Sequence, residues 1–125
     1  MAKKLGKGVI EVRGRYRPRK IICTGLFIRS HLLECGEDYP FNMWRALKEA
    51  KKEAKQKVGS YQNFRNFISQ LLRLGLIKFT REEPSQNPHF QPRRYYTYVP
   101  QSIDKVELWR NPRRALYPET WEKHH

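Results

Sequence analysis

The segment from Ser60 to Gly75 limits the fold of this chain more than any other part of it. Apolar side chains recur there at the helical spacing i, i+3, i+4, i+7 and i+8, at Phe64, Phe67, Ile68, Leu71 and Leu72. Ser60 can cap the start of a helix by accepting a bond from a first-turn N–H, and Gly75 ends it. The sequence therefore predicts an amphipathic helix over 60–74 that buries one side.

The opposite face of this predicted helix is polar but contains no acidic residue. It carries Gln62, Arg65, Asn66, Ser69 and Arg73, and residues 60–77 contain no Asp, Glu or Lys. Solvated helix surfaces usually carry Glu and Lys, so this composition favours a binding surface over an ordinary solvated face.

Two further helices are predicted before residue 60. The first is capped by Thr24 and ends at Gly36. The second begins near Pro40 and extends to about Lys57, with an apolar side and a separate basic side formed by Arg45, Lys48, Lys52 and Lys55. Gly59 can adopt positive φ, which predicts a very tight turn between the second and third helices.

An antiparallel hairpin is predicted after the third helix. Residues 76–80 and 93–99 are rich in β-branched and aromatic side chains, and the loop between them, 84–92, contains three prolines. By alternation Tyr96 and Tyr98 share one face of the strand and Tyr95 lies on the other. The periodicity of 102–109 does not decide between helix and strand. Four side chains of the extension could cover the domain or form a dimer contact, namely Trp109, Leu116, Tyr117 and Trp121.

The charge of the chain points to a polyanionic partner. It contains 26 Lys and Arg against 12 Asp and Glu, a formal net charge of +14. Half of this excess lies in the first twenty residues, which predicts a basic arm over 1–20. The predicted helices and hairpin then place a folded domain over 21–100, followed by an extension over 101–125. No stretch approaches the roughly 20 apolar residues of a membrane span. We expect an intracellular protein, cytoplasmic and associated with the nucleoid, or nuclear in a eukaryote.

Catalytic, metal and cofactor motifs are not found in the sequence. The spacings of Cys23, Cys35, His31 and His89 fit no known zinc ribbon or finger, so we expect free thiols without a metal. No Gly-rich phosphate loop or nucleophile elbow occurs. We expect neither an enzyme nor a cofactor.

The order helix, helix, tight turn, helix, strand, loop, strand over residues 26–99 resembles the winged helix-turn-helix DNA-binding superfamily. The most specific part is SYQNFRNFISQLLRLGLI at 60–77, an amphipathic helix ending in Leu-x-x-Leu-Gly-Leu-Ile before a hairpin. The resemblance implies a mostly helical α+β fold, three helices with a C-terminal hairpin wing, and frequent action as a homodimer.

These observations together predict a sequence-specific transcription regulator that binds double-stranded DNA. Helix 60–74 would read bases in the major groove, while the second helix, the arm and the wing contact the backbone or the minor groove. Arg93 and Arg94 are expected at the base of the wing. The candidate DNA-binding residues are Tyr61, Gln62, Asn63, Arg65, Asn66, Ser69, Arg73, Arg45, Lys48, Lys52, Lys55, His89, Gln91, Arg93, Arg94, Arg13, Arg15, Arg17 and Arg19.

Three alternatives remain open at this point. The basic arm also suits an architectural or chromatin-like protein. The tyrosines of 93–99 could present an open stacking surface to RNA, as in a ribosome-associated protein. A protein–protein adaptor is a third reading, and the charge excess argues against it.

Overall fold

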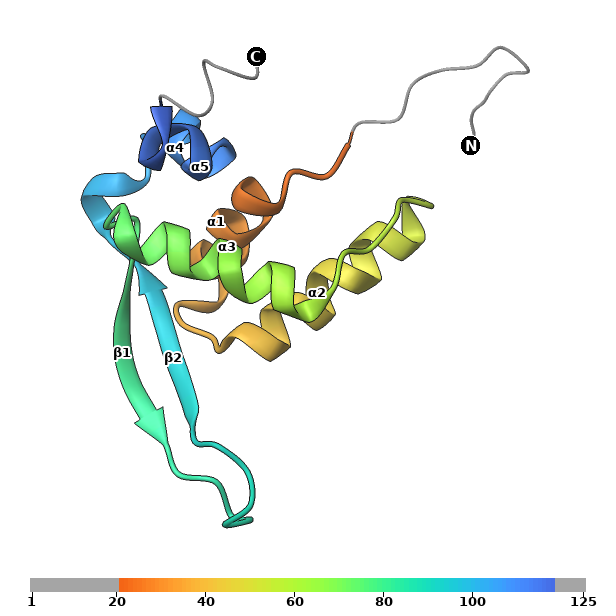
Figure 1. Cartoon of the computed structure of the whole chain (residues 1–125), viewed down its shortest axis with the longest axis vertical. Helices are drawn as coiled ribbons and strands as arrows, with labels where there is room; N and C mark the ends of the chain where they lie inside the picture. Colours follow the sequence, from red (N-terminus) through yellow and green to blue (C-terminus); the bar gives the residue numbers. More distant parts are fainter. Residues whose placement is uncertain (1–20, 119–125) are drawn as a thin grey trace.

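The computed structural model describes residues 21–118, which form three helices followed by a two-stranded hairpin and a short helical extension (Figure 1). The helices and strands are α1 (Thr24–Cys35), α2 (Pro40–Glu53), α3 (Tyr61–Arg73), β1 (Ile77–Glu83), β2 (Arg93–Tyr98), the 3₁₀ turn η1 (Pro100–Ser102), α4 (Val106–Arg110) and α5 (Pro112–Leu116). The predicted α+β class, with a hairpin after three helices, is confirmed.

The core lies where α1, α2 and α3 meet the start of the hairpin. The buried hydrophobic cluster at this meeting point comprises Ile28, Leu32, Met43, Leu47, Phe64, Ile68, Leu71, Leu76, Ile77 and Trp109. Phe67 and Leu72 are partly buried against this cluster. The apolar side predicted for helix 60–74 therefore faces the core, as its spacing requires.

Trp109 of α4 belongs to this core. It has no exposed surface, and its indole Nε1 donates to the carbonyl oxygen of Ser102 at 2.8 Å. The close approach of α4 to α1 requires glycine at position 25, because a Cβ there would lie 1.6 Å from the Trp109 carbonyl oxygen. Trp109 is thus unavailable for a homodimer contact. Tyr117 is 40% exposed, and Trp121 lies outside the described residues.

The predicted second helix is wrong at its C-terminal end. α2 ends at Glu53, because Lys55 takes φ 58° and the Gln56 N–H donates to the Lys51 carbonyl oxygen at 2.8 Å. Lys55 in the left-handed conformation and the backbone hydrogen bond from Gln56 to Lys51 together form a Schellman motif, which ends the helix. Lys55 therefore lies beyond the helix, on the connection to α3.

Two local features near these helices also differ from expectation. The prediction of a very tight turn at Gly59 is wrong. Residues 54–60 form the connection between α2 and α3, and Gly59 does not adopt positive φ. Thr24 is the first residue of α1 rather than its cap. Cys23 holds the cap position in extended backbone, without a side-chain capping bond.

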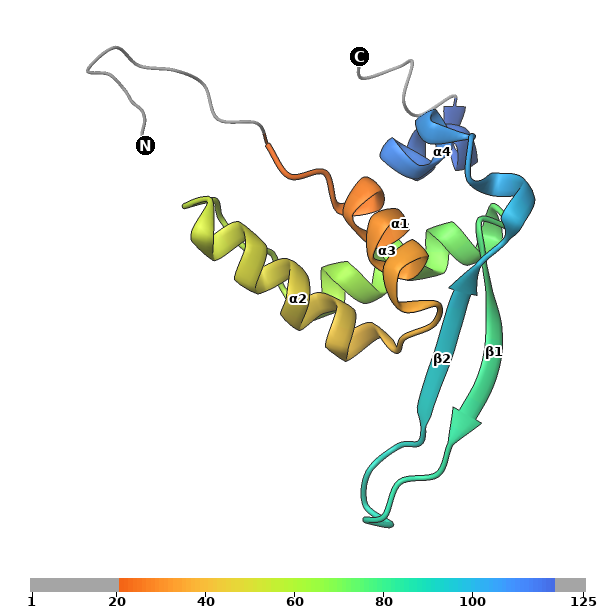
Figure 2. The same cartoon turned by 180° about the vertical axis from the view of Figure 1, so that it is seen from behind.

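The hairpin is antiparallel, with register from Ile77 opposite Tyr98 to Glu83 opposite Arg93 and an irregularity between Phe79 and Arg81. β1 is longer than the predicted 76–80. The hairpin projects away from the helices (Figures 1 and 2). Over residues 21–118, no helix has both the length and the apolar content that a bilayer crossing demands.

The loop after α1 fastens the hairpin to the helices. Asp38 and Tyr96 exchange two backbone hydrogen bonds, of 3.1 and 2.9 Å. The Glu37 carboxylate accepts from Arg81 Nε at 2.6 Å and from Thr80 Oγ1 at 2.8 Å. The bond from Arg81, and after it the bond from Thr80, lowers the pKa of the Glu37 carboxyl. The carboxylate therefore stays charged down to more acidic pH, and the contact weakens only as pH falls through that lowered pKa.

Candidate nucleic-acid interface

The polar face of α3 is open to solvent along its length in the described structure. Gln62, Asn63, Arg65, Asn66 and Ser69 are all exposed. Figure 1 shows α3 across the near side of the helices with α1 behind it, and Figure 2 shows α1 in front when the molecule is turned round. The face predicted to contact bases is thus not covered by the hairpin.

The first turn of α3 is fixed by its cap. The Ser60 hydroxyl accepts from the Asn63 backbone N–H at 3.1 Å, which confirms the predicted capping role. One turn further along, Gln62 Nε2 donates to Asn66 Oδ1 at 3.2 Å. The two amide side chains therefore lie side by side on the exposed face.

Replacing the capping serine should weaken the start of α3. We expect Ser60→Ala to lower the free energy of unfolding by about 1 kcal/mol, because the Asn63 N–H loses its acceptor. Ser69→Ala, in the same helix but exposed and away from the cap, should change stability by less than about 0.5 kcal/mol. Urea unfolding of both variants measures this, and equal stabilities would contradict the capping role.

An aromatic cluster joins the start of α3 to α2. The Tyr61 ring centroid lies 5.3 Å from that of Phe41 and 5.4 Å from that of Trp44. Burial here raises the pKa of the Tyr61 hydroxyl. Lys48 Nζ lies 5.0 Å from the Trp44 ring centroid, a cation–π distance. The start of α3 and the N-terminal part of α2 are thus held in a fixed relation.

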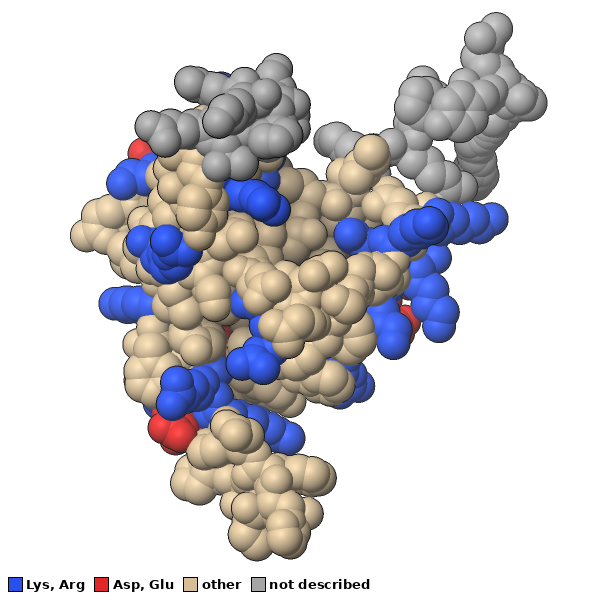
Figure 3. All heavy atoms as spheres, in the orientation of Figure 1, with Lys and Arg blue, Asp and Glu red and all other residues tan. Residues whose placement is uncertain are grey.

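The basic residues predicted on the second helix are exposed. Arg45, Lys48 and Lys52 lie on α2, and Lys55 follows it. Figure 3 shows Lys and Arg side chains gathered over the α2 side of this view and again over the hairpin, with few acidic side chains between them. Among the charged side chains seen on this face, Lys and Arg therefore outnumber Asp and Glu.

The last turn of α3 is tied to the C-terminal extension. The Arg73 Nη1 donates to the Tyr117 hydroxyl, and its guanidinium carbon lies 5.4 Å from the Tyr117 ring centroid. A shallow groove runs between Ser69, Arg73 and Arg113 of α5. The N-terminal half of the α3 face is thus freer to meet a ligand than the C-terminal half.

The expectation that Arg93 and Arg94 lie at the base of the hairpin is wrong. Because β1 continues to Glu83, these arginines lie at the loop end of the hairpin, opposite Glu83 and Glu82. Arg93 Nη1 is 3.7 Å from Glu83 Oε1. The exposed loop beyond them contains His89 and Gln91. The loop end of the hairpin therefore carries positive arginine side chains next to negative glutamate side chains.

The three tyrosines of β2 are occupied by contacts within the domain. Tyr96 and Tyr98 pack against the core, while Tyr95 donates to Glu83 Oε1 at 2.9 Å and lies 5.4 Å from the Tyr39 ring. The hydrogen bond to Glu83 raises the pKa of the Tyr95 hydroxyl. These rings are half-buried and do not form the open stacking surface on which the RNA alternative depended.

Other candidate residues are placed as follows. Arg13, Arg15, Arg17 and Arg19 lie outside the described residues. Of the Cys and His residues considered for a metal, the structure brings His31 and Cys35 together, with Sγ and Nε2 3.4 Å apart. Asp38, which no pattern in the sequence singles out as a ligand, joins them. Although Cys35 is exposed overall, partial desolvation of its thiol, followed by the charges of Asp38 and Glu34, raises the pKa of that thiol.

Searches of the chain against protein-family models, curated proteins and solved structures found no significant match.

Proposed function

We propose that this protein is a sequence-specific DNA-binding transcription regulator of the winged-helix type, with α3 as its recognition helix. The observation that carries the proposal is the exposed, acid-free face of α3, which bears Gln62, Arg65 and Asn66 on a helix anchored to the core by its other side. In this arrangement the helix can enter a groove without being displaced from the domain.

The side chains of that face suit the edges of base pairs. The major groove admits an α-helix and shows a distinct donor and acceptor pattern for each base pair. Gln62 and Asn66 carry amides of the kind that pair with adenine, and Arg65 carries the guanidinium that pairs with guanine. An acidic side chain on this face would be repelled by the flanking phosphates, and residues 60–77 contain none.

Backbone contacts would come from the basic residues beside α3. Arg45, Lys48 and Lys52 are exposed on α2, which the aromatic cluster of Phe41, Trp44 and Tyr61 holds against the start of α3. The first twenty residues add further positive charge. Such contacts position the protein on the duplex without reading its sequence.

The proposal predicts steep salt dependence. If about six phosphates are neutralised, the slope of log K against log salt should be near −5, at about −0.9 per phosphate. Fluorescence anisotropy with a labelled duplex over a series of NaCl concentrations measures the slope. A flat dependence would contradict phosphate binding by these residues.

An architectural duplex-binding protein is the alternative, favoured by the high charge of the chain. The comparison that separates the two uses a duplex selected from a random pool, a scrambled duplex of the same length and a structured RNA, all at one salt concentration. A regulator should prefer the selected duplex. Equal affinity for both duplexes would support the architectural function, and preference for RNA would overturn both.

A further inference from the structure

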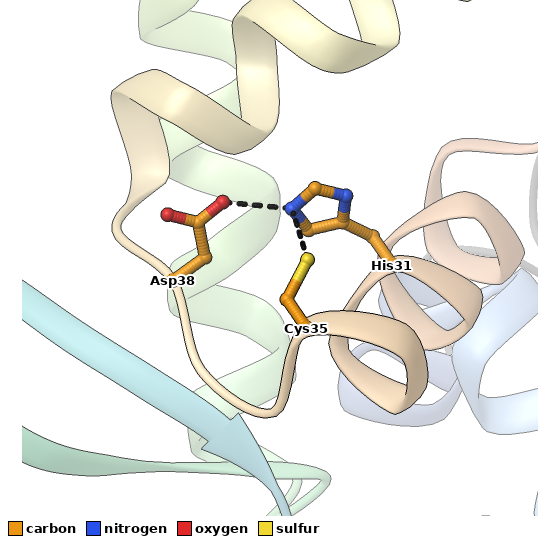
Figure 4. A group of neighbouring side chains, drawn as sticks. All are labelled: His31, Cys35 and Asp38. Carbon is orange, nitrogen blue, oxygen red and sulfur yellow. Dashed lines mark hydrogen bonds and ion pairs between the residues drawn. The ribbon is translucent and has the colours of Figure 1, made fainter.

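His31, Cys35 and Asp38 form a compact cluster where α1 ends and α2 begins (Figure 4). His31 and Cys35 are one helical turn apart on α1, so their side chains share a face. Asp38 comes from the loop that follows. His31 Nε2 lies 2.7 Å from Asp38 Oδ2 and 3.4 Å from Cys35 Sγ.

The carboxylate of this cluster is held rigidly. Asp38 is 5% exposed, its Oδ1 accepts from the Tyr39 N–H at 2.8 Å, and its Oδ2 accepts from Asn42 Nδ2 at 2.7 Å. The backbone bonds to Tyr96 fix the residue from the other side. Its Oδ2 is thereby directed at His31, in the manner of a ligand oriented by outer hydrogen bonds.

The geometry does not suit a nucleophilic relay. In such a relay the thiol and the carboxylate contact opposite nitrogens of the imidazole. Here both contact the same nitrogen, Nε2, as the two dashed lines of Figure 4 show. One sulfur, one nitrogen and one oxygen therefore converge, and these donor atoms all lie within 4.8 Å of one another.

We propose that these three residues bind a zinc ion. Thiolate, imidazole nitrogen and carboxylate are the ligands that Zn²⁺ takes in proteins, whereas Mg²⁺ prefers oxygen alone. On binding, the Cys35 thiol gives up its proton to solvent, and neutral His31 coordinates the ion through Nε2 in the tautomer that carries its single ring proton on Nδ1. Cys35 is exposed, so the ion can enter from solvent and a water molecule can complete four-coordination.

Binding would link three parts of the domain. The ion would join the end of α1 to the loop whose backbone pairs with β2 and from which α2 starts. It should therefore stabilise the attachment of the hairpin to the helices, because a ligand that binds only the folded state shifts the unfolding equilibrium.

Titration of the reduced full-length chain with Co²⁺, followed by Zn²⁺, tests the proposal. Co²⁺ bound by a thiolate gives a sulfur-to-metal charge-transfer band in the near ultraviolet. We expect this band to appear with one equivalent of Co²⁺ and to disappear when Zn²⁺ displaces it. Mg²⁺ in large excess should not displace it.

Matched variants separate this site from other metal-binding groups. Cys35→Ser should abolish the band, while Cys23→Ser, which changes the other cysteine, should retain it. His31→Gln should weaken Co²⁺ binding at least about tenfold. Removing His124 and His125, which contain no sulfur, should leave the band unchanged. Zn²⁺ should raise the melting temperature of the wild type but not of Cys35→Ser.

Two results would overturn the zinc site. One is no charge-transfer band in the wild-type protein, even if Co²⁺ binds. The other is an equal band in the wild type and in Cys35→Ser. Because Cys35 is exposed, its replacement by serine should leave the fold intact, and circular dichroism provides that check.

Discussion

Trp109→Ala is expected to lower the free energy of unfolding by about 3–5 kcal/mol, a large part of the stability of a domain this size. The indole is fully buried among the side chains of the helical core, so its removal leaves a cavity that the short α4 cannot fill. The loss of its Nε1 also leaves the Ser102 carbonyl oxygen without that donor. Urea or thermal unfolding followed by circular dichroism measures the effect.

Tyr117→Ala provides the control for this prediction. Tyr117 is an aromatic residue of the same extension, is 40% exposed and contacts Arg73 at the surface. Its replacement should cost less than about 1 kcal/mol. If Trp109→Ala were as stable as Tyr117→Ala, the extension would not be part of the core.

The double substitution of Arg65 and Asn66 by alanine is expected to abolish most of the discrimination between a selected and a scrambled duplex. Each good bidentate contact to a base contributes roughly 1–3 kcal/mol of discrimination, so each loss corresponds to about five- to 150-fold in relative affinity. Both side chains are exposed, so the fold should remain intact. Anisotropy titrations with the two duplexes at one salt concentration measure the ratio.

Lys52→Ala is the matched control for the double variant in α3. It removes an exposed charge from α2, which we propose contacts phosphates. It should weaken binding to both duplexes by the same factor and reduce the salt slope by about one. Loss of discrimination in Lys52→Ala, or its retention in the double variant, would contradict the division of roles between α2 and α3.

The limits of α3 could be predicted because its signals are local. Ser60 caps it through its own side chain, and Gly75 takes φ 75° just after it ends. α2 was harder to predict, since the run after Ala50 is rich in residues that favour helix. Its end depends on Lys55 in a left-handed conformation for which glycine is the usual signal.

Features that depend on distant contacts were not predictable from the sequence. The sequence left Trp109 between covering the domain and forming a dimer contact, because its five-residue helix is too short for a periodic pattern, and its full burial beside Gly25 places it in the core. Asp38 looks like an ordinary loop acid until its backbone pairing with Tyr96 brings it to His31. The position of Arg93 at the loop end of the hairpin depends on how far β1 extends, which the sequence did not indicate.

The most direct test of base contacts by α3 is the selection of bound duplexes from a random pool. The selection is carried out with the wild type and with the double variant in which Arg65 and Asn66 are replaced by alanine. The wild type should enrich one short sequence, and the variant should lose its preference at neighbouring positions within it. The same enriched sequence from both proteins, or none from the wild type, would contradict the assignment of α3 as the recognition helix.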